Sequence, residues 1–125
     1  MLDTINKQLK RIDEENIVWF IYFFLIFYNL YSNKLEKESL LETNPVKKKE
    51  AMEINAFVLL VAFLIYIYFV ARSYNDCNNL GINATPKKKV FTELTLLASV
   101  FFLIGGGIAL YVVVNNRGDE EVGLV

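Results

Sequence analysis

The chain has 125 residues, of which 54% are hydrophobic and 22% charged, and its 13 basic and 14 acidic side chains leave a net charge of −1. This length suits a single domain, and the balanced charge excludes the basic footprint of a nucleic-acid-binding protein. The chain has no histidine and one cysteine, Cys77, which excludes an intrachain disulfide, imidazole metal ligands and Ser-His or Cys-His catalytic pairs. We therefore expect no catalytic residues, no metal, no cofactor and no nucleic-acid partner.

Three segments without charge dominate the hydrophobic pattern: residues 16–33, 54–71 and 94–116. Apolar runs of about 18 residues or more are typical of membrane spans rather than of core helices in soluble proteins. The sequence therefore predicts an all-α integral membrane protein. Its three transmembrane helices would form an up-down-up hairpin bundle with short amphipathic or extended helical flanks.

We expect a single membrane domain over residues 1–125, with a lipid bilayer as its surroundings. Its predicted parts are a polar, amphipathic N-terminus (1–16), span one (17–32), a charged connection (33–53), span two (54–72), a basic connection (73–90), span three (91–115) and an acidic tail (116–125).

The N-terminal residues Leu2, Ile5, Leu9 and Ile12 are spaced three or four apart, which is the pattern of an amphipathic helix that lies along a membrane surface. The apolar run after them, residues 17–31, is short, and eight of its fifteen side chains are aromatic. Such side chains favour the membrane–water boundary, and we interpret them as interfacial anchors rather than as a cofactor-stacking box. The predicted anchors at the two ends of the run are Trp19, Tyr22, Tyr28 and Tyr31.

Two asparagine- or threonine-proline pairs mark helix starts. In each pair a capping side chain precedes a proline that suits the first helical position. The pairs are Asn44-Pro45 and Thr85-Pro86. The first helix could extend beyond the membrane as an amphipathic segment that contains Leu35, Leu40 and Leu41. The second helix could run toward Asn79, and Gly81 is its predicted stop signal.

Span three carries the most unusual feature, a run of three glycines at its centre. Small residues let another helix approach closely. Three interpretations remain open: packing of span three on spans one and two, self-association or docking on another protein, and a gating hinge or pore lining. The candidate residues are Gly105, Gly106, Gly107, Ala109, Ala98 and Ser99.

Polar residues near the membrane ends give two further candidate sites. Asn29 and Asn55 are expected on the same side of the membrane, where they could hydrogen-bond across helices or form a polar constriction in an oligomeric pore. Two lysine triplets are predicted to anchor the chain at the interface and to contact anionic lipid headgroups. These lysines are Lys47, Lys48, Lys49, Lys87, Lys88 and Lys89.

The basic residues are divided almost equally between the two predicted sides. Seven lie on the side of the N-terminus and the second connection, and six on the opposite side, which favours a cytoplasmic N-terminus and an external C-terminus. We therefore expect a multi-pass protein of the cell membrane. No ionisable group lies deep in a predicted span, which disfavours proton-coupled transport.

The leading functional hypothesis is a small non-enzymatic membrane protein that acts as an accessory or assembly subunit through helix–helix packing. Its partner would be another membrane protein or further copies of the chain. The alternative is a homo-oligomeric pore or ion channel, a membrane-permeabilising effector lined by span three. A third hypothesis is an immunity or regulatory membrane protein.

Overall fold

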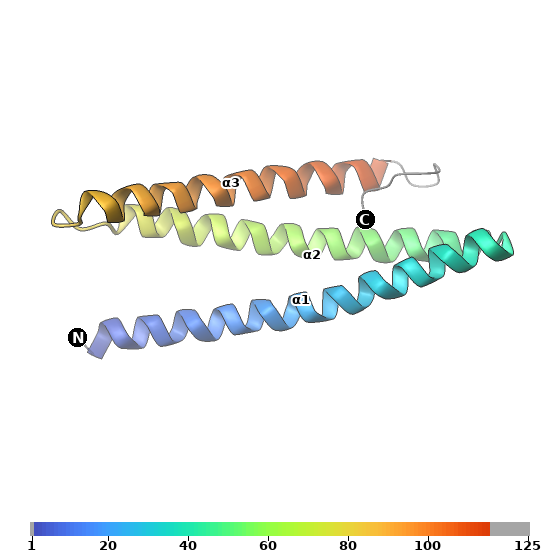
Figure 1. Cartoon of the computed structure of the whole chain (residues 1–125), viewed down its shortest axis with the longest axis horizontal. Helices are drawn as coiled ribbons and strands as arrows, with labels where there is room; N and C mark the ends of the chain where they lie inside the picture. Colours follow the sequence, from blue (N-terminus) through green and yellow to red (C-terminus); the bar gives the residue numbers. More distant parts are fainter. Residues whose placement is uncertain (1, 116–125) are drawn as a thin grey trace. The chain divides into compact units, whose positions relative to one another are not determined.

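The computed structural model describes residues 2–115, which form three α-helices: α1 (Leu2–Glu42), α2 (Pro45–Asn78) and α3 (Pro86–Asn115) (Figure 1). No strand occurs among these residues, so the predicted all-α class is confirmed. The chain divides into two compact units, residues 1–54 and 55–125, with the boundary inside α2. The first unit contains α1 and the first turns of α2, and the second contains the rest of α2 and α3. The predicted acidic tail, 116–125, lies outside the described residues.

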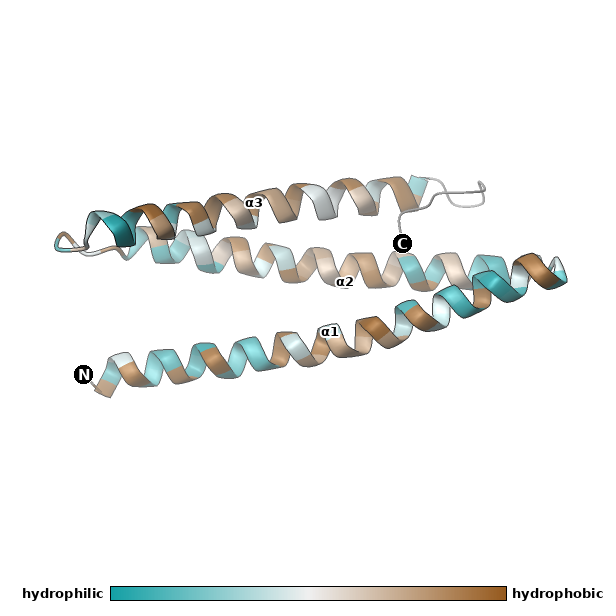
Figure 2. Ribbon diagram, in the orientation of Figure 1, coloured by the Kyte–Doolittle hydropathy of each residue, from teal (hydrophilic) through white to brown (hydrophobic). Residues whose placement is uncertain are grey.

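Two of the three helices, α2 and α3, are long and apolar enough to cross a membrane, and the apolar character of α3 is plain along its central turns in Figure 2. α1 does not reach the same hydropathy over the length of a span. Its apolar run, residues 17–31, contains Asn29 together with one tryptophan and three tyrosines, whose polar groups lower the hydropathy of the segment. The structure therefore supports two candidate spans where the sequence predicts three.

Both predicted helix starts are confirmed. The Asn44 side-chain oxygen accepts hydrogen bonds from the backbone N–H groups of Val46 at 3.0 Å and Lys47 at 3.4 Å, and α2 begins at Pro45. These bonds satisfy N–H groups that have no partner within the first turn of a helix.

The start of α3 is built in the same way, because Thr85 Oγ1 accepts a bond of 3.1 Å from the Lys88 N–H and the helix begins at Pro86. At its other end α2 stops at Asn78, one residue before the predicted limit at Asn79.

α1 is a single unbroken helix of 41 residues, about 60 Å long at 1.5 Å per residue. The amphipathic N-terminal segment, the aromatic run and the leucine-containing extension therefore belong to one element. A helix that lay along the membrane surface and then turned to cross it would need a break between residues 16 and 17. α1 has none there, and it contains neither glycine nor proline, the residues that most often break or kink a helix.

The end of α1 is held by Thr43, which has a positive φ of 52°. The N–H of Asn44 donates to the carbonyl of Ser39 at 3.1 Å, the six-to-one bond of a Schellman motif. A glycine normally occupies the left-handed position of this motif. Thr43 is β-branched, so this conformation is strained.

We expect Thr43→Gly to stabilise the first unit by up to about 1 kcal/mol, because glycine removes a left-handed strain of about 1–2 kcal/mol while increasing the entropy of the unfolded chain. Thr43→Ala is the matched control, since alanine keeps a Cβ and should gain little. Unfolding midpoints of the three proteins in one detergent would measure the effect. Equal gains for glycine and alanine would contradict the assignment.

Candidate helix-packing and interfacial sites

The glycine run of α3 is divided between two faces of the helix. A Cβ added at Gly106 would lie 2.8 Å from Cδ2 of Tyr66, and one added at Gly107 would lie 3.2 Å from Cε1 of Phe63. Both aromatic rings belong to α2. The rings therefore occupy the space that side chains at these two glycines would need, so two of the three glycines serve the close approach of α2 and α3.

Gly105 lies on the other face, where an added Cβ would have no atom within 4 Å. Ala98, two turns earlier, is also exposed, whereas Ala109 is partly buried. The six small residues singled out in the sequence thus do not form one surface. Ala98 and Gly105, seven residues apart, are the members that lie open to the surroundings.

A second contact between α2 and α3 joins two hydroxyl groups. The Oγ atoms of Ser73 and Ser99 lie 3.0 Å apart, and Ser99 Oγ also donates to the carbonyl of Thr95 at 2.9 Å. Ser73 is buried. Its hydroxyl therefore has the hydrogen-bond partner that a buried polar group needs where water is excluded.

Further contacts flank this pair along the hairpin. The rings of Tyr66 and Phe102 stack at a centroid distance of 5.9 Å. The thiol of Cys77 lies 3.7 Å from the carbonyl of Thr92 and has no disulfide partner. The α2–α3 hairpin is therefore joined by ring, hydroxyl and thiol contacts over several turns.

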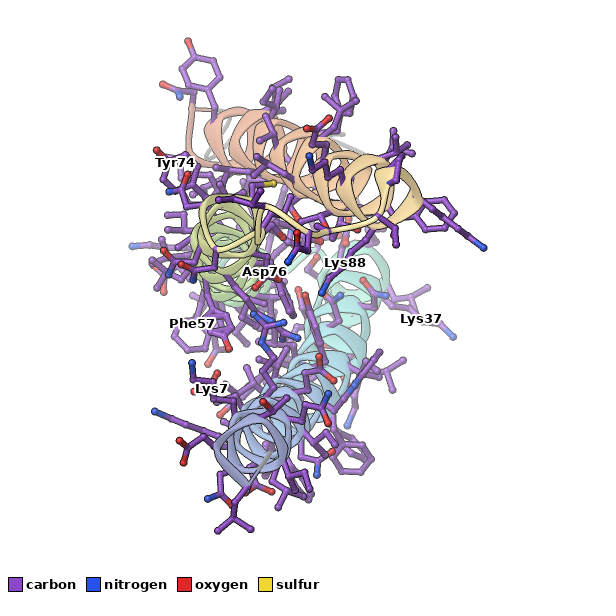
Figure 3. All side chains as sticks on the ribbon, turned by 90° about the vertical axis from the view of Figure 1, so that its left-hand side faces the viewer. Lys7, Lys37, Phe57, Tyr74, Asp76 and Lys88 are labelled. Atoms are coloured by element: carbon purple, nitrogen blue, oxygen red, sulfur yellow. The ribbon has the colours of Figure 1, made fainter. Side chains whose placement is uncertain are left out.

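The loop end of this hairpin forms an open groove of about 420 Å³. Figure 3 looks toward this end of the molecule and labels Asp76 and Lys88, which both line the groove. Lys87 also lines it, and its Nζ lies 5.6 Å from the centroid of the Phe91 ring. The groove is further lined by Ser73, Thr85, Phe91, Thr92 and Thr95. Two of the six predicted headgroup lysines thus border this open surface groove.

In the first unit, α1 and the start of α2 meet through small residues. Ser32 Oγ donates to the carbonyl of Ala51 at 2.8 Å, and the two residues are only 3% and 4% exposed. Leu35 and Ser39, one and two turns further along α1, are also buried. The small side chains let the two backbones approach closely enough for a side chain of one helix to reach the backbone of the other.

Lys47 bridges the two helices of this unit rather than standing alone. Its Nζ lies 3.0 Å from a carboxylate oxygen of Glu38 and 2.9 Å from one of Glu42. Its hydrogen bonds to Glu42 and then Glu38 raise the pKa of Lys47, and the bond to Lys47 lowers the pKa of Glu38. A lysine predicted to contact lipid headgroups is thus engaged by two carboxylates, while Lys49 and Lys89 are exposed.

The four predicted interfacial aromatic residues all lie on α1. Trp19 and Tyr22 contact each other at a centroid distance of 6.0 Å, and Tyr28 and Tyr31 are both about half exposed. The predicted asparagine pair stays a prediction, because Asn29 belongs to the first unit and Asn55 to the second. The side-chain oxygen of Asn29 is buried without a hydrogen-bond partner.

Sequence reasoning missed the α2 side of the α3 contacts. Phe63, Tyr66 and Ser73 carried no motif, and they matter only because they lie opposite the glycines and Ser99. A usable signal existed for Ser73, since a hydroxyl close to an apolar segment needs a partner. The same signal existed for Ser32, the last residue of predicted span one, whereas Ala51 offered none.

Comparisons with protein-family models, with curated proteins and with solved structures find no match to this chain. Within residues 2–115, no group of three or more histidine, cysteine, aspartate or glutamate side chains is arranged to hold a metal ion.

Proposed function

We propose that this chain is a non-enzymatic integral membrane protein that crosses the bilayer three times and acts as an accessory or assembly subunit through helix–helix packing. The observation that carries the proposal is the exposure of its most apolar helices. In the most apolar segment of α3 only 6% of the residues are buried, and in that of α2 only 17%. The core helix of a soluble protein would be mostly covered, and an apolar surface this extensive is stable only against lipid or protein.

The third crossing would be α1. Its aromatic run would span a locally thinned bilayer, with Trp19 and Tyr22 at one interface and Tyr28 and Tyr31 at the other. This topology places the N-terminus in the cytoplasm and the C-terminus outside, on the small excess of basic residues on the N-terminal side.

The side chains of α3 favour helix packing over a pore. Thr92, Thr95 and Ser99 each donate their hydroxyl proton to the carbonyl four residues earlier in the same helix. Gly106 and Gly107 lie against rings of α2, so they are not available to line a channel. The outward surface around Gly105 is apolar, with Phe101 63% and Ile108 60% exposed. Such a surface suits another helix or lipid better than a column of water.

The test is the behaviour of the full chain in membranes and mild detergent. We expect it to stay in the membrane fraction after extraction at alkaline pH, to purify as a monomer or dimer, and to conduct no ions in liposomes. A discrete assembly of four or more copies with measurable ion flux would support the pore instead. Release into the aqueous fraction would overturn both proposals.

A further inference from the structure

One face of α1 carries a seven-residue repeat over four heptads, which we call the α1 seam. Its members alternate at intervals of three and four residues, and eight of the nine are apolar. They are Leu2, Ile5, Leu9, Ile12, Asn16, Trp19, Phe23, Ile26 and Leu30. All nine are exposed, the eight apolar ones by 46% to 73%. A period of 3.5 residues sustained over four heptads is the pattern of a helix that pairs with another helix.

The shape of the α1 seam fits the side chains of a partner helix. Asn16, Trp19, Phe20 and Phe23 line a surface hollow of about 490 Å³ on α1. These residues have the spacing i, i+3, i+4 and i+7, so they form one diamond on the helix surface. In knobs-into-holes packing a diamond of four residues receives one side chain of the facing helix. The hollow therefore has the position and the spacing of such a hole.

Lipid cannot cover the whole of the α1 seam. This step rests on the proposed function, in which residues 17–31 cross the bilayer. Because α1 is unbroken, residues 2–16 then project about 20 Å from the hydrocarbon at 1.5 Å per residue. Leu2, Ile5, Leu9 and Ile12 would face water there, at a free-energy cost that a covering protein surface removes.

The α1 helix of a second copy of the chain could cover the α1 seam, because it carries the same apolar repeat. Copies inserted in the same orientation have parallel α1 helices, and a parallel in-register pair brings Asn16 against the second copy's Asn16. An amide both donates and accepts hydrogen bonds, and a single asparagine at such a position selects the register and the number of helices. The residues beside the α1 seam do not oppose this arrangement. Gln8, which is uncharged, would face the second copy's Asp13, so this pair brings no like charges together. We propose that the α1 seam binds a second copy of this chain as a parallel, in-register helix pair.

Cysteine cross-linking in native membranes tests this pairing. In a Cys77→Ser background, Leu9→Cys places a thiol on the α1 seam, and Lys7→Cys places one on the opposite face (Lys7 is labelled in Figure 3). We expect mild oxidation to give a disulfide-linked dimer with Leu9→Cys and at least roughly fivefold less with Lys7→Cys. The reason is that disulfides form only between Cα atoms about 4.4–6.8 Å apart. Equal yields, no cross-linked product, or a product containing a different protein would overturn the proposal.

A third variant separates specific pairing from chance collision. Adding Ile12→Glu to the Leu9→Cys protein places like charges on both sides of the pair, so the dimer band should be lost. Ile12 is exposed, so the fold of the single chain should tolerate the change, and an undiminished dimer band would contradict the pairing. Alkaline extraction of the same membranes tests the proposed function separately. Release of a chain that still cross-links through Leu9→Cys would overturn the membrane proposal and support the pairing.

Discussion

Gly106→Leu is expected to open the α2–α3 hairpin, at a cost of about 3 kcal/mol or more in the free energy of unfolding. A Cβ alone would lie 2.8 Å from the ring of Tyr66, and leucine adds three further carbon atoms behind it. Cε2 of the same ring would lie only 3.0 Å away, so the Tyr66 ring would have to turn away from α3 to make room. Overpacking of this kind usually costs about 1–3 kcal/mol and occasionally more. Unfolding of the purified protein in detergent would measure the loss.

Gly105→Leu is the matched control, one residue earlier in the same helix. Nothing lies within 4 Å of a Cβ at this position, so we expect a change within about 0.5 kcal/mol, as for other surface substitutions. A reduced association with a partner and unchanged stability would place Gly105 in a docking surface. If Gly106→Leu yields no folded protein, the smaller Gly106→Ala, with and without Tyr66→Leu, keeps the prediction testable. Equal stabilities of the two leucine variants would contradict the contact.

Ser32→Leu is expected to separate α1 from the start of α2 within the first unit, with a loss of about 1–3 kcal/mol. Ser32 is 3% exposed, and its hydroxyl donates to the Ala51 carbonyl at 2.8 Å. Leucine removes this bond and adds volume where Ala51 leaves no room. Hydrogen exchange of the backbone amides in the last turns of α1 and the first turns of α2 would report the separation, beside the unfolding midpoint.

Two variants divide this effect into its parts. Ser32→Ala deletes the hydroxyl without adding volume, so it should cost about 1 kcal/mol, the usual net value of one hydrogen bond. Asn33→Leu adds an apolar side chain at the neighbouring exposed position and should leave the amide exchange unchanged. An exchange pattern for Ser32→Leu like that of Asn33→Leu would show that the small-residue contact does not hold the helices together.

The helix boundaries could be predicted because their causes are local. Asn44 and Thr85 cap the next helix through bonds to residues two or three positions away, and the prolines after them suit the first turn. The continuity of α1 was harder to foresee. Its sequence changes from amphipathic to aromatic and back to charged, which suggested separate parts, yet no residue in it interrupts the helical hydrogen bonds.

Candidate membrane spans could be predicted from the sequence only where the mean hydropathy of a helix is high enough to identify them. α2 and α3 meet the requirement of length and apolar composition. The charge-free run of α1, residues 16–33, is as long as the second run, 54–71. Its tyrosines, tryptophan and asparagine nevertheless make it intermediate between a span and an interfacial helix. Whether such a segment crosses the membrane depends on the helices and lipid around it, which its own residues do not specify.

The amino-acid sequence by itself determined the all-helical class, the capped starts of α2 and α3, and the apolar character of these two helices. These features depend on the side chains and on neighbours within a few residues. Only the tertiary structure decided which faces meet. Three consecutive glycines point in three directions about 100° apart, so their order along the chain cannot say that Gly106 and Gly107 receive rings of α2 while Gly105 stays open. The rotation of one helix against another, set by packing between residues 26 or 40 positions apart, makes that choice.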